Sequence, residues 1–233
     1  MSNYILQGSN IGKNYGKYSI LKDVTLSLEA GEIYGLIGKN GSGKTTLFRI
    51  LTGLIQDYNG TVLTNESKIS GVISVPALFL NMTAFQNMKA QSHLLGINNN
   101  DKIGEVLKTV GLSKKNKKLV RDYSLGMTQR LKLALALLEN PDILILDEPS
   151  NGLDPDGIAD LRDLLIELNR KHGITILVSS HILSELGLMA TRLGILHNGK
   201  IVKELTEKDV FVDSVKLEQI YRECTRKGGD YHD

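Results

Sequence analysis

The sequence has few of the features that mark a secreted, metal-binding or membrane-spanning protein. A single cysteine, Cys224, can form no disulfide within the chain, which favours a reducing compartment. The five histidines are scattered, without the spacing typical of a metal site. No apolar run approaches the length needed to cross a bilayer, and the start Met1-Ser2-Asn3 resembles no signal peptide. We therefore expect a soluble intracellular protein.

The chain also lacks a strong charge of either sign. Across 233 residues, 28 Lys and Arg balance 26 Asp and Glu, so the overall charge indicates no acidic partner. One basic run, Lys114–Arg121, could meet nucleic acid or anionic lipid. Because no aromatic residues interleave with these charges, a solvated loop is the favoured interpretation, and we expect no nucleic-acid partner.

Strand-like apolar runs alternate with stretches of helical periodicity. The runs "EIYGLIG", "ISGVISV", "DILILDEP" and "GITILVSS" have strand length, and helical patterns such as "KTTLFRILTGL" stand between them. This alternation predicts an α/β fold with a parallel sheet and helices on both of its faces. The alternating residues Val24, Leu26 and Leu28 predict a half-buried strand before that core.

Two segments depart from the alternation. Residues 79–139 are predicted to be mainly helical, and Asn198-Gly199 predicts a tight hairpin. We expect residues 1–233 to form a single domain, with a helical subdomain at roughly 79–139 inserted in its core. A short amphipathic helix is expected at roughly 213–227.

A glycine-rich segment, "GKNGSGKT", follows the first buried strand and precedes a helix. It fits G-x-x-x-x-G-K-[ST] in the strand–loop–helix context that this phosphate-binding motif requires. Glycines let backbone N–H groups turn toward phosphate oxygens, and the helix N-terminus adds positive partial charge. We expect Lys44 to reach the β- and γ-phosphates and Thr45 to bind Mg²⁺. The expected nucleotide-binding residues of this loop are Gly38, Asn40, Gly41, Ser42, Gly43, Lys44, Thr45 and Thr46. A glycine-rich turn without a ligand is the alternative.

Two carboxylates follow the most apolar strand. Four aliphatic residues precede Asp147 and Glu148, which places both acids at the carboxyl end of a buried strand, where α/β folds bind ligands. Asp147 is expected to hold Mg²⁺ through water, and Glu148 to polarise the attacking water. A pair of acids that only caps a helix before Pro149 is the alternative.

His181 follows the strand "ITILVSS" at the same edge of the predicted sheet. It could be a surface histidine at a helix start, or a residue that hydrogen-bonds the γ-phosphate during catalysis. The set of neighbouring motifs favours the second role.

These motifs stand in one order that resembles a known family. The phosphate loop, "YSLGMTQR", "LDEPSNGLD" and "SSH" are similar to the ATP-binding cassette (ABC) ATPases over essentially the full chain. The resemblance implies a P-loop NTPase core with an N-terminal antiparallel β region. It also implies that two cassettes enclose two ATP molecules, and that Ser124 and Gly126 contact the γ-phosphate held by the partner cassette. Ser124 as an ordinary helix N-cap is compatible with that role.

The resemblance assigns further residues one by one. Tyr15 matches the aromatic residue that stacks on adenine, with Tyr18 as the alternative, and Asp154 matches the segment that crosses between cassettes. The tail "LEQIYRECT" resembles the usual end of a single cassette, so we expect no regulatory domain after it.

Three positions depart from the family pattern. Ser74 stands where the family has a metal-binding glutamine, and Leu125 and Met127 replace a glycine and a glutamine in the signature. The stretch "VISVPALFLNMTAFQNM" resembles the branch that serves bacitracin resistance and lantibiotic immunity.

The expected function is therefore ATP hydrolysis for a separate membrane permease, with ATP and Mg²⁺ as cofactors. We expect a homodimer with ATP, in the cytoplasm and attached to the inner face of the membrane through the permease. A soluble ABC ATPase in cofactor assembly and a nucleotide-gated sensor remain open alternatives.

Overall fold

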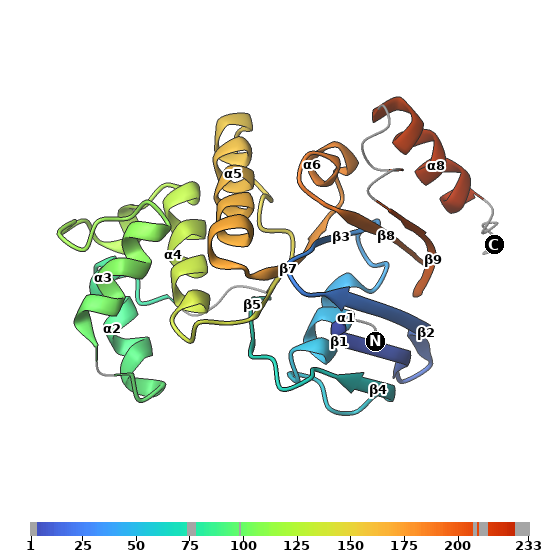
Figure 1. Cartoon of the computed structure of the whole chain (residues 1–233), viewed down its shortest axis with the longest axis horizontal. Helices are drawn as coiled ribbons and strands as arrows, with labels where there is room; N and C mark the ends of the chain where they lie inside the picture. Colours follow the sequence, from blue (N-terminus) through green and yellow to red (C-terminus); the bar gives the residue numbers. More distant parts are fainter. Residues whose placement is uncertain (1–3, 74–77, 98, 207–208, 210–213, 227–233) are drawn as a thin grey trace.

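The computed structural model describes residues 4–73, 78–97, 99–206, 209 and 214–226 (Figure 1). Its strands are β1 (Tyr4–Tyr15), β2 (Tyr18–Glu29), β3 (Ile33–Ile37), β4 (Asn59–Leu63), β5 (Ile69–Val72), β6 (Ile143–Leu146), β7 (Thr175–Ser180), β8 (Arg192–His197) and β9 (Lys200–Leu205). Its helices are α1 (Lys44–Leu51), α2 (Ala84–Leu94), α3 (Asn100–Thr109), the 3-10 turn η1 (Val120–Asp122), α4 (Leu125–Leu137), α5 (Pro155–His172), α6 (Leu183–Gly187) and α8 (Ser214–Arg226). Within these ranges, no helix is long and apolar enough to cross a membrane.

The strands form two sheets. A three-stranded antiparallel sheet has the order β2-β1-β4, and a six-stranded sheet has the order β5-β6-β7-β3-β8-β9. In the larger sheet β5, β6, β7, β3 and β8 run parallel, while β9 returns antiparallel through the Asn198-Gly199 turn. The α/β fold with a parallel sheet is confirmed, and β9 adds an antiparallel edge strand to it.

The central sheet separates two apolar cores because successive side chains on a strand point to opposite faces. On β6, Ile143 and Ile145 pack with α1 and the antiparallel sheet, whereas Leu144 and Leu146 pack with the core that contains α4 and α5. All four side chains are fully buried. A strand buried on both faces has only its ends near water, so polar groups that follow β6 must gather at its carboxyl end.

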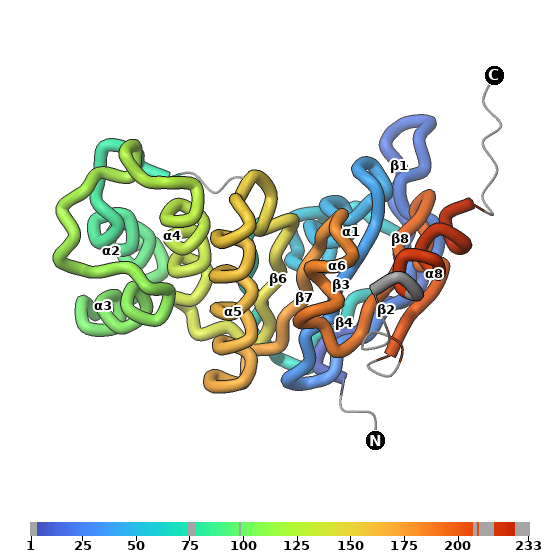
Figure 2. The backbone as a smooth tube through the Cα atoms, turned by 90° about the horizontal axis from the view of Figure 1, so that it is seen from above, coloured from blue at the N-terminus to red at the C-terminus, as the bar shows by residue number. Residues whose placement is uncertain are grey.

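The helices α2, α3 and α4 gather at one end of the molecule, opposite β1, β2 and α8 (Figures 1 and 2). Thr83 and Gln86 form a reciprocal capping box that starts α2. A backbone hydrogen bond joins the segment before α2 to η1, since the Val120 N–H donates to the carbonyl of Met82 at 2.9 Å. The helical part meets the sheet where α4 packs against β5.

Candidate functional site

The loop between β3 and α1 has backbone N–H groups that no side chain caps, and it borders a pocket. Gly43 is the N-cap of α1 at φ +112°, and no side chain caps the helix. A Cβ on Gly38 would lie 2.6 Å from the Leu196 carbonyl oxygen, so only glycine fits there. The Ser42 hydroxyl is buried and has no hydrogen-bond partner among the described residues. Uncapped N–H groups and an orphaned hydroxyl are the donors that a phosphate group would accept from.

Lys44 is held at the centre of this loop. Its side chain is 5% exposed, and its ammonium donates to the Gly38 carbonyl at 2.5 Å. The same nitrogen lies 3.0 Å from Glu148 Oε1. The predicted phosphate-binding lysine and the predicted general base are therefore ion-paired, and a phosphate would compete with Glu148 for this ammonium.

The second carboxylate faces Thr45. The Thr45 hydroxyl donates to Asp147 Oδ2 at 2.5 Å, and Ser179 Oγ donates to Asp147 Oδ1 at 2.8 Å. The described residues contain no cluster of three or more His, Cys, Asp or Glu side chains that could hold a metal. Mg²⁺ usually binds one or two carboxylates together with substrate phosphates and waters, so the oxygens of Thr45 and Asp147 fit it.

Glu148 is held by groups from three segments. Its backbone is left-handed at φ +47°, and its N–H donates to Ser179 Oγ at 2.9 Å. Its Oε2 lies 2.9 Å from His181 Nδ1. Partial burial raises the pKa of this carboxyl, but hydrogen bonding and charge from Lys44, together with His181, outweigh burial and hold the pKa below its ordinary value. The lowered pKa favours an ionised Glu148 carboxylate, and this carboxylate contacts the predicted γ-phosphate sensor.

A cavity of about 710 Å³ opens in front of these groups. Its lining includes the predicted residues Tyr15, Asn40, Gly41, Gly43, Lys44, Thr45, Thr46, Asp147 and Glu148. Tyr15 is 47% exposed at the cavity, and the ammonium of Lys13 lies 5.1 Å from its ring centre. The neighbouring Tyr18 is 76% exposed and does not line the cavity.

Six predicted residues lie outside this lining. Gly38, Ser42 and His181 lie beside it, at the loop and the acid pair described above, and the other three are Ser124, Gly126 and Asp154. Ser124 is exposed and is the N-cap of α4, where its Oγ accepts from the Met127 N–H at 3.3 Å. Gly126 stands in the first turn, with no atom closer than 4.0 Å to a Cβ built on it. Asp154 is the N-cap of α5 and accepts from the Gly157 N–H at 2.9 Å. Within one chain, these three residues have structural positions at helix starts.

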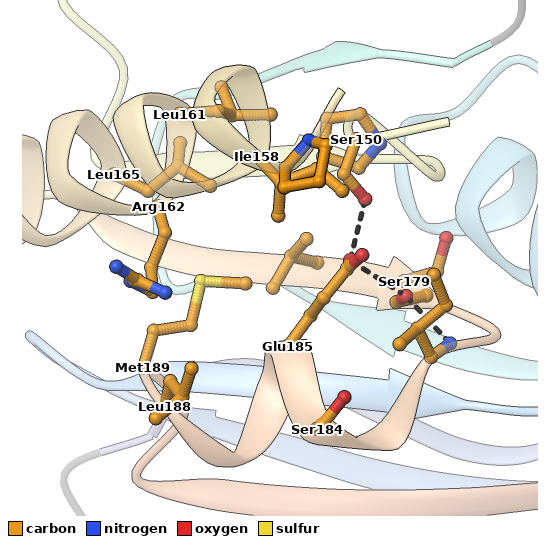
Figure 3. Close-up of a pocket in the computed structure, with 15 residues that line it drawn as sticks. Ser150, Ile158, Leu161, Arg162, Leu165, Ser179, Ser184, Glu185, Leu188 and Met189 are labelled. Carbon is orange, nitrogen blue, oxygen red and sulfur yellow. Dashed lines mark hydrogen bonds between the residues drawn. The ribbon is translucent and has the colours of Figure 1, made fainter. Parts of the chain in front are cut away.

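A second, smaller cavity of about 240 Å³ lies between α5, α6 and β7, and Pro149 and Ser150, which follow the acid pair, also line it (Figure 3). Glu185 reaches across it, and its Oε2 accepts from Ser150 Oγ at 2.7 Å and from Ser180 Oγ at 3.3 Å. Ser150 follows the acid pair and Ser180 precedes His181. Glu185 therefore fixes the turns that carry both catalytic candidates.

Sequence reasoning missed Ser179, Glu185 and Lys132. Two serines at the end of an otherwise apolar strand are the available signal for Ser179, since a buried hydroxyl needs a polar partner. A lysine inside the apolar run of α4 is the signal for Lys132, which lines the large cavity. Glu185 gives no signal, because an acid in the first turn of a helix is ordinary.

The site combines three features: a glycine-rich phosphate loop, an acid pair at the end of a buried strand, and a histidine beside the second acid. Together they define a nucleoside triphosphatase of the P-loop class.

Comparison with known proteins identifies the group within that class. The ABC transporter family matches residues 21–151. The bacitracin transport ATP-binding protein BcrA of Bacillus licheniformis is 41% identical over 86% of this chain and 69% of its own. The lantibiotic transport ATP-binding protein SrtF of Streptococcus pyogenes is 42% identical over 86% of this chain and 90% of its own. The chain belongs to the ABC transporter family, as an ATP-binding subunit that hydrolyses ATP.

Solved structures agree with this assignment. The ADP conformation of MJ1267, an ATP-binding cassette of an ABC transporter, matches with a TM-score of 0.82 at 25% identity and covers 94% of this chain and 98% of its own. A dimer of the cassette MJ0796 bound to ADP and Pi matches with a TM-score of 0.75 at 26% identity, covering 87% of this chain and 98% of its own.

Proposed function

We propose that this ATPase subunit drives a separate membrane permease that exports peptide antibiotics. The observation that carries the ATPase chemistry is the contact chain from Lys44 through Glu148 to His181, next to the Thr45–Asp147 pair. The similarity to BcrA and SrtF, whose names specify bacitracin and lantibiotic transport, supports the substrate class. In this proposal residues 1–233 act as one cassette, placed at the inner face of the membrane by the permease.

The predicted residues at and beside the large cavity have proposed tasks. The N–H groups of the phosphate loop and Ser42 bind phosphate oxygens, and Tyr15 covers the adenine. Lys44 leaves Glu148 for the β- and γ-phosphates, which frees Glu148 to accept a proton from the attacking water. His181 holds the γ-phosphate side of the site and keeps Glu148 oriented.

Magnesium is a proposed cofactor. Thr45 and Asp147 would hold it, and their oxygen donors suit a hard cation. When bound, Mg²⁺ supplies positive charge that offsets the charge of the transferring phosphoryl group. Ser74, the departure from the family's glutamine, lies outside the described residues.

The working form is proposed to be an ATP-bound homodimer. Ser124 is exposed at the N-terminus of α4, where free N–H groups and the helix dipole favour an anion. In a dimer, Ser124 and Gly126 of one copy would meet the γ-phosphate held by the other copy. Asp154 would lie in the crossing segment between the copies.

The experiment that tests this function uses Glu148→Gln. Loss of a positioned general base lowers turnover by about 10²–10⁴-fold, and the phosphate contacts stay intact. The variant should therefore retain ATP and form a dimer on size exclusion with light scattering, and it should return to a monomer with ADP.

A second substitution supplies the control. Ser124→Arg in the Glu148→Gln background should abolish the dimer, because a long cation fills the space proposed for the γ-phosphate. Normal ATP hydrolysis by Glu148→Gln would remove Glu148 from its role. A dimer that persists in the double variant would remove Ser124 from the interface.

A further inference from the structure

Lys132 is a buried lysine for which the proposed site has no use. Its side chain is 9% exposed, within the apolar body of α4. Within the described ranges it makes no hydrogen bond or ion pair. Its Nζ is not among the fully buried polar atoms that lack a partner, and Lys132 lines the large cavity, so the ammonium reaches that cavity at the end of a buried stem. Partial loss of water without a counter-ion has a cost, and an anion bound in the cavity would offset it.

The side chain belongs to one face of α4 that lines the large cavity. Leu125, Gln129 and Lys132 all contribute to the lining. Their spacing of i, i+4 and i+7 places them on one helical face. This stripe is the surface that α4 presents to the nucleotide cavity.

Lys132 enters the cavity from the side of the acid pair. Helix α4 packs on β5, and β5 pairs with β6, which leads directly to Asp147. The Asp147 N–H donates to the Val72 carbonyl at 3.0 Å, and Val72 also lines the cavity. Tyr15 stands on β1 of the other sheet (Figure 1). The adenine end and the Lys132 end of the cavity are thus distinct.

The two acids of the site differ in whether a cation neutralises them. Glu148 is paired with Lys44, whereas the Asp147 carboxylate accepts from the hydroxyls of Thr45 and Ser179 and has no cationic partner among the described residues. Burial lowers the pKa of Lys132, as expected for an ammonium that has lost water and lacks a close anion. A triphosphate would bring the missing negative charge to this end of the cavity.

We infer that Lys132 is a second cation for the terminal phosphate of bound ATP, reaching it from the α4 wall opposite Lys44. This inference rests on the proposed nucleotide site and adds a residue to it. It gives the helical end of the molecule a direct contact with the phosphate that hydrolysis removes. ATP and ADP should therefore be distinguished by Lys132 within a single chain.

The test is titration calorimetry of the full chain with ATP and with ADP, for the wild type and for Lys132→Met. Methionine keeps the length and the apolar stem of the side chain but lacks the charge. ATP affinity should fall about ten- to a hundredfold, the size expected for a hydrogen bond between charged groups. ADP affinity should change less than about threefold, and the midpoint of urea unfolding should stay equal or rise.

Two further variants complete the experiment. Lys132→Arg keeps the charge and should retain most of the ATP affinity, whereas Lys118→Met removes an exposed lysine and should change nothing. Equal losses for ATP and ADP, or ATP affinity unchanged in Lys132→Met, would overturn the inference. If the wild type itself fails to bind ATP, the proposed nucleotide site fails instead.

Discussion

The two walls of the large cavity differ in how many of their polar groups find a partner within the same chain. The loop wall, made of residues 38–46 with Asp147 and Glu148, has its charged groups paired by Lys44, Thr45 and Ser179. The α4 wall is lined by Leu125, Gln129 and Lys132, and Lys132 has no partner among the described residues. The exposed Ser124 stands just before this wall, at the N-terminus of α4. One wall is preorganised within the chain, and the other presents polar groups whose proposed partners come with nucleotide or a second copy.

The largest expected effect is that of Lys44→Ala, which tests whether the loop wall is preorganised to bind phosphate. The ammonium lies between the Gly38 carbonyl and Glu148, and its loss leaves the acid unpaired as well as removing a phosphate ligand. We expect ATP binding to weaken by at least two orders of magnitude, about 3 kcal/mol, the upper range for hydrogen bonds to charged groups. Titration calorimetry measures this, with Lys118→Ala, at an exposed lysine outside the site, as the matched control. Affinity retained in Lys44→Ala would show that the loop wall is not preorganised for phosphate.

A smaller effect is expected at the edge of the loop wall, from Tyr15→Ala. The tyrosine is half exposed at the cavity, and Lys13 lies over its ring. Loss of base–aromatic stacking should weaken ATP binding by about 1–3 kcal/mol. Tyr18→Ala is the control, because Tyr18 does not line the cavity. If Tyr18→Ala shows the loss and Tyr15→Ala does not, the stacking role belongs to Tyr18.

The loop wall is also the part of the cavity whose position follows most directly from the sequence. Its residues are local: the spacing from Gly38 to Thr45 fixes a loop between a strand and a helix, and four aliphatics before Asp147 fix a buried strand. Parallel strands then bring their carboxyl ends to one edge, so Asp147, Glu148 and His181 could be expected to lie close together.

The α4 wall could not be predicted in the same way. The sequence neighbours of Lys132 are apolar, as they are for a core residue. The packing of α4 on β5 is what places Lys132 at the cavity. Glu185 likewise depends on tertiary structure, because its partner Ser150 is 35 residues away along the chain. Side chains that act across elements need the assembled fold before their roles can be stated.

Substitutions at Ser124 separate the two roles given to the α4 wall. Ser124→Ala removes the N-cap and should lower the free energy of unfolding by about 1 kcal/mol. Ser124→Asp keeps a capping oxygen and should retain stability, but its negative charge would repel a γ-phosphate. In the Glu148→Gln background, Ser124→Asp should therefore abolish the ATP-dependent dimer. Urea unfolding and light scattering measure the two effects, and a dimer that tolerates Ser124→Asp would leave Ser124 only its capping role.

The smallest expected effect is the pH dependence of the loop wall. Glu148 has a pKa held below its ordinary value in the folded chain, chiefly by Lys44 against the opposing effect of burial. The unfolded chain then binds more protons than the folded chain in the window between the two pKa values. The stabilisation from this group is fully present above the ordinary pKa and is lost as pH falls through the lowered one. Urea midpoints of wild type and Glu148→Gln should therefore converge as pH falls below 4.5, the ordinary pKa of a glutamate. Glu167→Gln is the comparison for an exposed ion pair, because Lys171 also lowers the pKa of that acid outside the site and solvent screens the pair, so its effect should be smaller. Midpoints that stay apart by a constant amount as pH falls through this range would show that the Lys44–Glu148 pair contributes nothing to the preorganisation of the loop wall.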